Sequence, residues 1–223
     1  MKRIDLEAYQ QILASATVLE RDAYGEKVLR LPDDRLVKLF RRKRWLSSAL
    51  LFPYALRFVR NAARLKALQI PTVKVVDLAH CAAAQRHLVT YEPLPGETLR
   101  TVLRDPATAL VSEIDSLARF VAQLHEKGVY FRSVHFGNII VLPDGCTLGL
   151  IDVADMVVRR GTLPVRERLR NFRHMLRYAE DVAALKRRGW ADFVECYLAA
   201  TSLADNDRFA LRQALLHLPE ISA

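Results

Sequence analysis

GVYFRSVHFGN (residues 128–138) and the adjoining IIVLPDGCTLGLID (residues 139–152) form the most informative part of this sequence. Pro143-Asp144-Gly145 supplies turn chemistry between two short apolar runs, which predicts a β-hairpin. Asn138 stands directly before the first strand of this hairpin, and Asp152 stands directly after the second. Because hairpin strands are antiparallel, these two residues are expected to meet at its open end.

The pair formed by Asn138 and Asp152 has the chemistry of a magnesium site. Mg²⁺ prefers oxygen ligands and usually keeps water and phosphate oxygens in its coordination shell. Each residue has a simpler explanation on its own, because asparagine is common in turns and aspartate often caps a helix. Their combination at one hairpin is much less common by chance, so we predict that both bind Mg²⁺.

The rest of the chain predicts an α+β fold with two lobes, a small β-rich lobe at residues 1–95 and a helical lobe at residues 96–223. A three- and four-residue apolar spacing after Pro53 predicts one helix over residues 54–69 in the first lobe. The segment EPLPG at residues 92–96 breaks the pattern and is the expected hinge. Short apolar runs predict five strands, at residues 17–20, 27–31, 35–40, 73–78 and 87–91.

The charge of the chain favours anionic partners. Its 223 residues include 34 Lys and Arg against 25 Asp and Glu, a formal net charge of +9. Five basic residues lie between Lys38 and Arg44. The later cluster consists of Arg159, Arg160, Arg166, Arg168, Arg170, Arg173 and Arg177. We expect a cytoplasmic protein, because no apolar run reaches the roughly 18 residues of a membrane span and the first residues lack the apolar core of a secretion signal.

Several segments resemble known kinases. RSVHFGNII at residues 132–140 resembles the catalytic loop of the protein-kinase superfamily, in the form found in small bacterial kinases. LIDVAD at residues 150–155 resembles the metal-binding D-F-G segment that follows this loop. VKLFRRKR at residues 37–44 and YEPLPG at residues 91–96 are similar to the lysine strand and the hinge of lipopolysaccharide-core kinases and toluene-tolerance-like proteins. The resemblance covers roughly residues 18–185.

This resemblance implies a two-lobed protein-kinase-like fold that binds ATP and Mg²⁺. Lys38 would contact the α- and β-phosphates, Gly25 would lie in the loop over the phosphates, and the backbone near Glu92 would hold the adenine. Asn138 and Asp152 would bind the metal ion. The usual acceptor in the family is a sugar hydroxyl of the lipopolysaccharide inner core, at the inner face of the cytoplasmic membrane.

The catalytic position departs from the family pattern. Ser133 stands five residues before Asn138, where the family has its catalytic aspartate, and Phe131 replaces the usual histidine. A serine hydroxyl is a poor general base near neutral pH. His135 would titrate in a useful range, although a buried structural histidine is the commoner case. The candidate catalytic residues are Arg132, Ser133, His135, Asn138 and Asp152.

The phosphate-binding segments depart from the pattern as well. Gly25 is a single glycine where kinases commonly have several. No Asp or Glu lies between Asp34 and Asp77, so the glutamate that usually orients the lysine is missing. Arg60 or Asn61 occupies roughly its place.

Two functions are consistent with these residues. The first is an ATP-dependent phosphotransferase acting on a lipopolysaccharide-core sugar, slowed by Ser133. The alternative is a pseudokinase that binds nucleotide or a partner protein without turnover. The basic charge disfavours an aminoglycoside kinase, and no nucleic-acid motif supports a nucleic-acid partner. Residues 41–44, followed by the apolar residues within 45–52, would suit peripheral contact with an anionic membrane, although a basic loop before a packed helix is the commoner arrangement.

Overall fold

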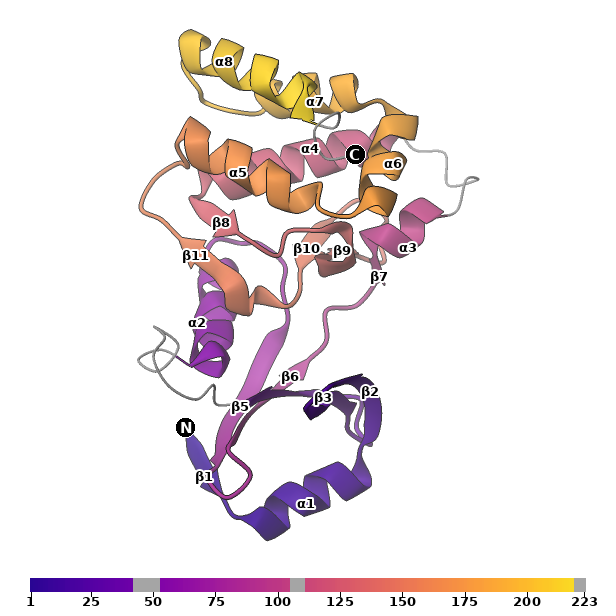
Figure 1. The fold of residues 1–223 in the computed structure, drawn as a ribbon, viewed down its shortest axis with the longest axis vertical. Helices are drawn as coiled ribbons and strands as arrows, with labels where there is room; N and C mark the ends of the chain where they lie inside the picture. Colours follow the sequence, from indigo (N-terminus) through magenta and orange to yellow (C-terminus); the bar gives the residue numbers. More distant parts are fainter. Residues whose placement is uncertain (42–52, 105–110, 219–223) are drawn as a thin grey trace. The chain divides into compact units, whose positions relative to one another are not determined.

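The computed structural model describes residues 1–41, 53–104 and 111–218 and divides into two compact units, Met1–Leu94 and Pro95–Ala223 (Figure 1). The chain passes from one unit to the other inside the EPLPG segment that was predicted to be the hinge. Most of the basic and apolar segment proposed to contact a membrane, residues 42–52, lies outside the described residues.

The first unit is built on a six-stranded sheet. Its strands are β1 (Lys2–Ile4), β2 (Thr17–Asp22), β3 (Gly25–Arg30), β4 (Leu36–Arg41), β5 (Lys74–Cys81) and β6 (Arg86–Glu92). The strand order is β1-β5-β6-β4-β3-β2, with antiparallel pairing except between β1 and β5. The five strands predicted from turn signals and apolar runs are all present, with small shifts at their ends.

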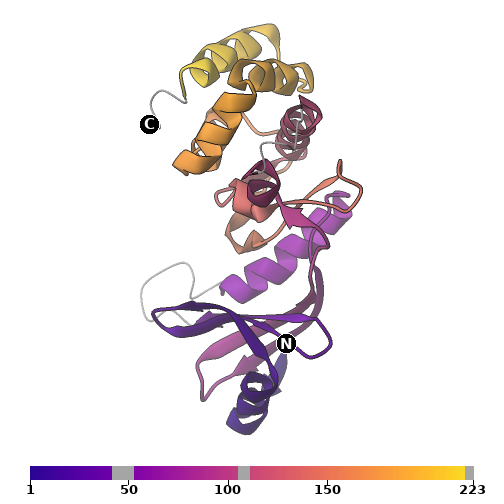
Figure 2. The ribbon, with the colours of Figure 1, turned by 90° about the vertical axis from the view of Figure 1, so that its right-hand side faces the viewer.

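Helices α1 (Leu6–Ser15) and α2 (Tyr54–Ala67) cover opposite faces of this sheet (Figure 2). On the α2 face, Phe58 packs against Phe40 and Tyr91, with ring centroids 5.9 and 5.5 Å apart. The face under α1 holds an apolar cluster of Leu29, Val37, Leu39, Ala79, Cys81 and Leu88.

The prediction of a single helix in this unit was wrong, because it omitted α1. The signal was present in the sequence, since apolar residues recur there at helical spacing. These residues are Leu6, Tyr9, Ile12 and Leu13. Asp5 caps the helix, its carboxylate accepting a hydrogen bond of 2.8 Å from the amide of Ala8.

The second unit is mostly helical. Its helices are α3 (Leu99–Arg104), α4 (Val111–Glu126), α5 (Val165–Met175), α6 (Ala179–Arg188), α7 (Trp190–Ala199) and α8 (Asp205–Leu216). Its strands are β7 (Glu97–Thr98), β8 (Val129–Phe131), β9 (Ile139–Val141), β10 (Leu148–Leu150) and β11 (Met156–Val158). The predicted hairpin is the β9–β10 pair, extended by β7, while β8 pairs with β11. Within the described parts of the chain, the helices are too short or too polar to cross a bilayer.

A buried chain of hydrogen bonds holds the end of β8. The Arg168 guanidinium can only donate, and it donates to the Tyr197 hydroxyl over 3.1 Å. That hydroxyl donates to His125 Nδ1 (2.8 Å), so His125 Nε2 donates to Asn171 Oδ1 (2.9 Å). The Asn171 amide completes the chain with a 2.6 Å bond to the carbonyl oxygen of Phe131. The carbonyl oxygen of Phe131 can only accept a hydrogen bond. Asn171 therefore donates to it and accepts from His125, and His125 accepts from Tyr197, so the chain has one orientation.

Burial keeps the middle of this chain neutral. His125 and Arg168 are both fully buried. Desolvation lowers the pKa of His125 to about 3 and raises the pKa of Tyr197 to about 12. The charge of Arg168 is balanced by Glu126, whose carboxylate lies 2.7 Å away. The end of β8, and with it the start of the loop at residues 132–138, is therefore anchored by neutral groups across the whole physiological pH range.

The pKa of His125 predicts acid-sensitive folding. An unfolded histidine has a pKa of about 6.5, so between that value and the folded value of about 3 the unfolded state binds more protons. The contribution to stability is complete above pH 6.5 and falls by about 1.4 kcal/mol per pH unit below it.

Urea denaturation of the protein at pH 6.5 and pH 4.5 should therefore show a loss of about 2 kcal/mol from His125 alone. His125→Gln keeps one donor and one acceptor but does not titrate. The free energy of unfolding should depend less steeply on pH in His125→Gln than in the wild type, and this difference isolates the contribution of the histidine. An equal pH dependence in the two proteins would contradict a neutral buried His125.

Candidate functional site

The predicted meeting of Asn138 and Asp152 is present at the open end of the β9–β10 hairpin. Ile139 pairs with Leu150, and one step further out the amide of Ile151 donates to the carbonyl oxygen of Asn138 over 3.0 Å. Asp152 follows Ile151 directly. The hairpin register therefore places the amide and the carboxylate at the same edge of the second unit.

The side chain of Asn138 has both amide hydrogens engaged. Nδ2 donates to the carbonyl oxygen of Ser133 (2.9 Å) and to Nε2 of His135 (3.1 Å). This arrangement fixes the amide plane and leaves Oδ1 as the atom that remains for a ligand. An amide oxygen held in this way is a suitable ligand for Mg²⁺.

His135 supports Asn138 through its neutral form. Because Nε2 accepts from Asn138, the ring proton resides on Nδ1, an atom that is buried and has no hydrogen-bond partner among the described residues. Burial, reinforced by the nearby charge of Arg100, lowers the pKa of His135. The ring of Tyr178 packs edge-on against the ring of His135, with the ring centroids 5.0 Å apart. A Cβ atom at position 137, where the chain has glycine, would lie 3.2 Å from His135 Nδ1. In this geometry the ring positions Asn138.

Asp152 adopts a backbone conformation that most residues avoid. Its φ of 53° and ψ of 44° lie in the left-handed region. It precedes the short 3₁₀ turn of Val153–Asp155, but its side chain makes no capping hydrogen bond there, so the explanation of this residue as a helix cap is wrong.

The oxygen atoms of Asn138 and Asp152 fit the requirements of Mg²⁺. This ion is usually bound through one or two carboxylates together with substrate phosphates and water. Across the described residues no group of three or more His, Cys, Asp or Glu side chains is suited to hold a metal. A metal ion at this edge would therefore depend on nucleotide phosphate oxygens to complete its shell.

Ser133 and Arg132 lie in the loop between β8 and the hairpin. The carbonyl oxygen of Ser133 accepts from the side chain of Asn138 and from the amide of His135, at 2.9 and 3.0 Å. Arg132 binds the carboxylate of Asp155 through Nε (3.0 Å) and Nη2. The nearest carboxylate downstream of the metal position is thus engaged by an arginine.

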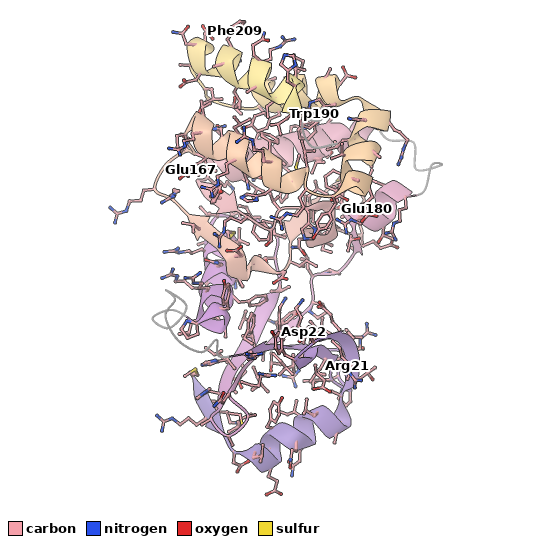
Figure 3. All side chains as sticks on the ribbon, viewed as in Figure 1. Arg21, Asp22, Glu167, Glu180, Trp190 and Phe209 are labelled. Carbon is pink, nitrogen blue, oxygen red and sulfur yellow. The ribbon has the colours of Figure 1, made fainter. Side chains whose placement is uncertain are left out.

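A buried aspartate that was not predicted from the sequence holds the loop at residues 132–138 in place. Asp181, in the first turn of α6 next to the labelled Glu180 (Figure 3), is 1% exposed. Its carboxylate binds Arg100 Nε and Nη2 at 2.8 and 2.9 Å and accepts from the amide of Phe136 at 3.1 Å. The hydrogen bond to Asp181 raises the pKa of Arg100. A sequence signal was lacking, because an acidic pair in a first helical turn is ordinary.

In the first unit, Lys38 lies on the sheet face that α2 covers. It is 7% exposed, and its ammonium lies 5.9 Å from the ring centroid of Phe40, which in turn contacts Phe58 of α2. One turn after Phe58, α2 presents Asn61, which is 1% exposed, whereas Arg60 is exposed. Of the two residues expected near the position of the missing glutamate, the inward-facing one is therefore the amide.

The proposed phosphate loop is the tight turn between β2 and β3. Gly25 has a φ of +111°, and a Cβ there would meet nothing within 4 Å, so the backbone conformation alone favours glycine. Arg86 Nη2 donates to the carbonyl oxygen of Tyr24 (2.9 Å), and the Arg41 guanidinium lies 4.1 Å from the centre of the Tyr24 ring. Two arginines thus hold this turn.

The proposed adenine-binding position is at the end of β6. There Glu92 is exposed, and its carboxylate pairs with Lys74 Nζ at 2.9 Å.

Removing the Asp181 carboxylate should destabilise the second unit. Asp181→Ala leaves Arg100 and the Phe136 amide without their shared partner, and breaking a buried pair of this kind costs about 3 kcal/mol or more. Glu180→Ala is the matched control, because this neighbour also pairs with Arg100 (3.1 Å) but is 46% exposed and is expected to cost less than about 1 kcal/mol. Urea denaturation measures both, and equal losses would contradict the assigned role.

Comparison with known proteins identifies the fold and the family. No curated protein gives a significant match. Two solved structures of WbdD, one bound to a kinase inhibitor and one described as a bifunctional kinase-methyltransferase, align with TM-scores of 0.50 and 0.48, each at 18% identity over 86% of this chain. The alignments cover 43% and 42% of those chains, so this protein spans less than half their length. The first confirms the predicted protein-kinase-like α+β fold. The family model for the lipopolysaccharide kinase (Kdo/WaaP) family matches residues 31–197, well over half of the sequence, and the chain therefore belongs to that family.

Proposed function

We propose that this protein is an ATP- and Mg²⁺-dependent phosphotransferase whose acceptor is a sugar hydroxyl of the lipopolysaccharide inner core. The observation that carries the proposal is the state of Asn138, whose two amide hydrogens are engaged while Oδ1 is left for a ligand, at the hairpin end where Asp152 follows Ile151. Membership of the lipopolysaccharide kinase family supports phosphotransfer as the reaction class and a glycolipid sugar as the acceptor.

The other site residues have roles that follow from this proposal. Lys38 would neutralise the α- and β-phosphates of ATP, and the turn at Gly25 would lie over those phosphates. The backbone near Glu92 would hold the adenine. Mg²⁺, bound through Asn138 and Asp152, would neutralise the charge of the transferring phosphoryl group.

We propose slow turnover because no carboxylate stands at position 133. A general base typically contributes roughly 10²–10⁴-fold in rate, and the remaining acceleration of phosphoryl transfer comes from positioning and electrostatic stabilisation. His135 is a positioning residue in this scheme, since Nε2 is engaged by Asn138 and Nδ1 is buried. Arg132 would act through the loop conformation that its pairing with Asp155 maintains.

The alternative is a pseudokinase that binds nucleotide or a partner protein without turnover. One observation favours it: the carboxylate of Asp155, the nearest substitute for the missing aspartate, is already engaged by Arg132. The nucleotide site would be the same in both cases, so only transfer to an acceptor separates them.

The proposed partners are anionic. A net charge of +9 suits a phosphate-bearing glycolipid and peripheral contact with the inner face of the cytoplasmic membrane. Nucleic acid is not an expected partner, because no nucleic-acid-binding motif accompanies the basic residues.

Calorimetric titration of ATP, with and without Mg²⁺, tests the nucleotide site. Asp152→Ala should abolish the part of the affinity that depends on Mg²⁺ and leave the part without the metal unchanged. Asp144→Asn is the matched control, because Asp144 lies at the turn of the same hairpin, at the opposite end from Asp152. If ATP fails to bind the wild-type protein under either condition, the proposal is wrong.

A second experiment tests the role of position 133. Ser133→Asp should raise the rate of phosphate transfer from labelled ATP to a core-sugar acceptor by roughly 10²–10⁴-fold, because it restores the missing base. Ser133→Ala should leave the wild-type rate nearly unchanged, because the serine hydroxyl is not the base. Absence of transfer by the wild type and by Ser133→Asp, with ATP binding intact, would favour the pseudokinase.

A further inference from the structure

The later basic cluster separates into inward- and outward-facing residues. Arg168 is fully buried and belongs to the hydrogen-bond chain that anchors β8, so it is not available to an anionic partner. Arg166, Arg170 and Arg173 recur at four- and three-residue spacing on α5 and are all exposed. They share one helical face that extends over about 10 Å. Arg177, also exposed, follows in the turn after the helix. We call these four residues the α5 arginine stripe.

The stripe is not neutralised by neighbouring carboxylates. Glu167, labelled at the first turn of α5 in Figure 3, is paired with Arg159 at 2.7 Å. In the part of the chain that the structure describes, no ion pair involves Arg166, Arg170 or Arg173. Arg177 donates hydrogen bonds to the carbonyl oxygen of Arg132 (3.4 Å) and to His174 Nδ1 (3.2 Å), and it forms no ion pair with a described residue. Its positive charge is therefore available to an external anion.

Helix stability does not account for the stripe. Basic residues are favourable in the last turn of a helix, which explains Arg173, but they are unfavourable in the first turn, where Arg166 lies. The opposite face of α5 is fixed by Asn171, Phe172 and Met175, all buried. The arginines therefore project from a helix that is already held in place, so they can bind without ordering the backbone first.

The electrostatic environment within the stripe is positive. His174, between Arg173 and Met175, has a lowered pKa because of burial and then because of the charges of Arg177, Arg170 and Arg132, which outweigh that of Asp155. The hydrogen bond from Arg177 to the Arg132 carbonyl also joins the stripe to the loop that carries Ser133.

We infer that the α5 arginine stripe is the surface by which this protein docks on an anionic lipid bilayer. Guanidinium groups bind phosphate oxygens in a forked geometry, and a row of them without acidic neighbours matches a surface that presents many phosphates rather than one small anion. Nucleic acid is the less suitable partner. Phe172, between the arginines, is buried, and the ring of Tyr178, which follows Arg177, is packed against His135 and Arg100, so neither ring is presented for stacking on bases. The inference rests on the membrane contact in the proposed function, which it assigns to α5 in place of residues 41–52.

Sedimentation with vesicles tests the inference on the whole chain without nucleotide. Each basic residue near an anionic leaflet contributes about fivefold in partitioning. Arg170→Gln with Arg173→Gln should therefore weaken binding to phosphatidylglycerol vesicles about 25-fold and leave negligible binding to phosphatidylcholine unchanged. Raising the ionic strength from about 0.1 to about 1 M should release the wild type, because the Debye length falls from about 10 to about 3 Å.

The matched control is Lys186→Gln with Arg187→Gln, which removes the same charge from exposed positions on α6. Loss of less than about threefold in this variant supports a defined surface. Equal losses in both double variants, unchanged binding after the α5 substitutions, or a preference of the stripe for duplex DNA over vesicles would each overturn the inference. Calorimetric binding of ATP should be the same in both double variants, so failure of the docking surface is distinguishable from failure of the nucleotide site.

Discussion

The hydrogen bond from Asn171 to the carbonyl oxygen of Phe131 is the constraint on which the catalytic segment depends. It is the last of a directed chain of donors that begins at the Arg168 guanidinium. The carbonyl oxygen can only accept, so Asn171 donates to it and accepts from His125 Nε2, and the neutral ring of His125 then accepts from Tyr197 at Nδ1. The position of the end of β8 is thus fixed by a residue of α5 that lies 40 residues later in the sequence. The loop that follows β8 therefore starts from a fixed position.

Next to Ser133, which differs from the kinase pattern, the loop keeps a well-defined hydrogen-bond geometry. Asn138 is oriented by two acceptors, and Asp181 holds the same loop through the Phe136 amide. On the sheet, α2 presents Asn61 where a glutamate would be usual. In the proposed function, the protein would combine a firmly held metal-binding edge with a weakened proton-transfer position, and such a division would reduce rate more than nucleotide affinity.

The sequence was sufficient where function depends on neighbours along the chain. The turn chemistry of residues 143–145 and the antiparallel register brought Asn138 and Asp152 together as predicted. The sequence did not predict hydrogen-bond partners that lie about 40 to 80 residues apart, such as Asp181 and Arg100. Their pairing depends on how α3 and α6 pack, which helical periodicity does not specify. Helix α1 is different, because its apolar residues recur at helical spacing in the sequence itself.

The left-handed backbone at Asp152 has a consequence for how this chain has been selected. An L-residue in that conformation costs about 1 kcal/mol relative to glycine, although aspartate tolerates it better than most. The fold would gain stability by giving up its own carboxylate. A protein that did not need this carboxylate would be more stable with glycine in place of Asp152. In the proposed function, binding of Mg²⁺ by this carboxylate would offset the cost of the backbone conformation.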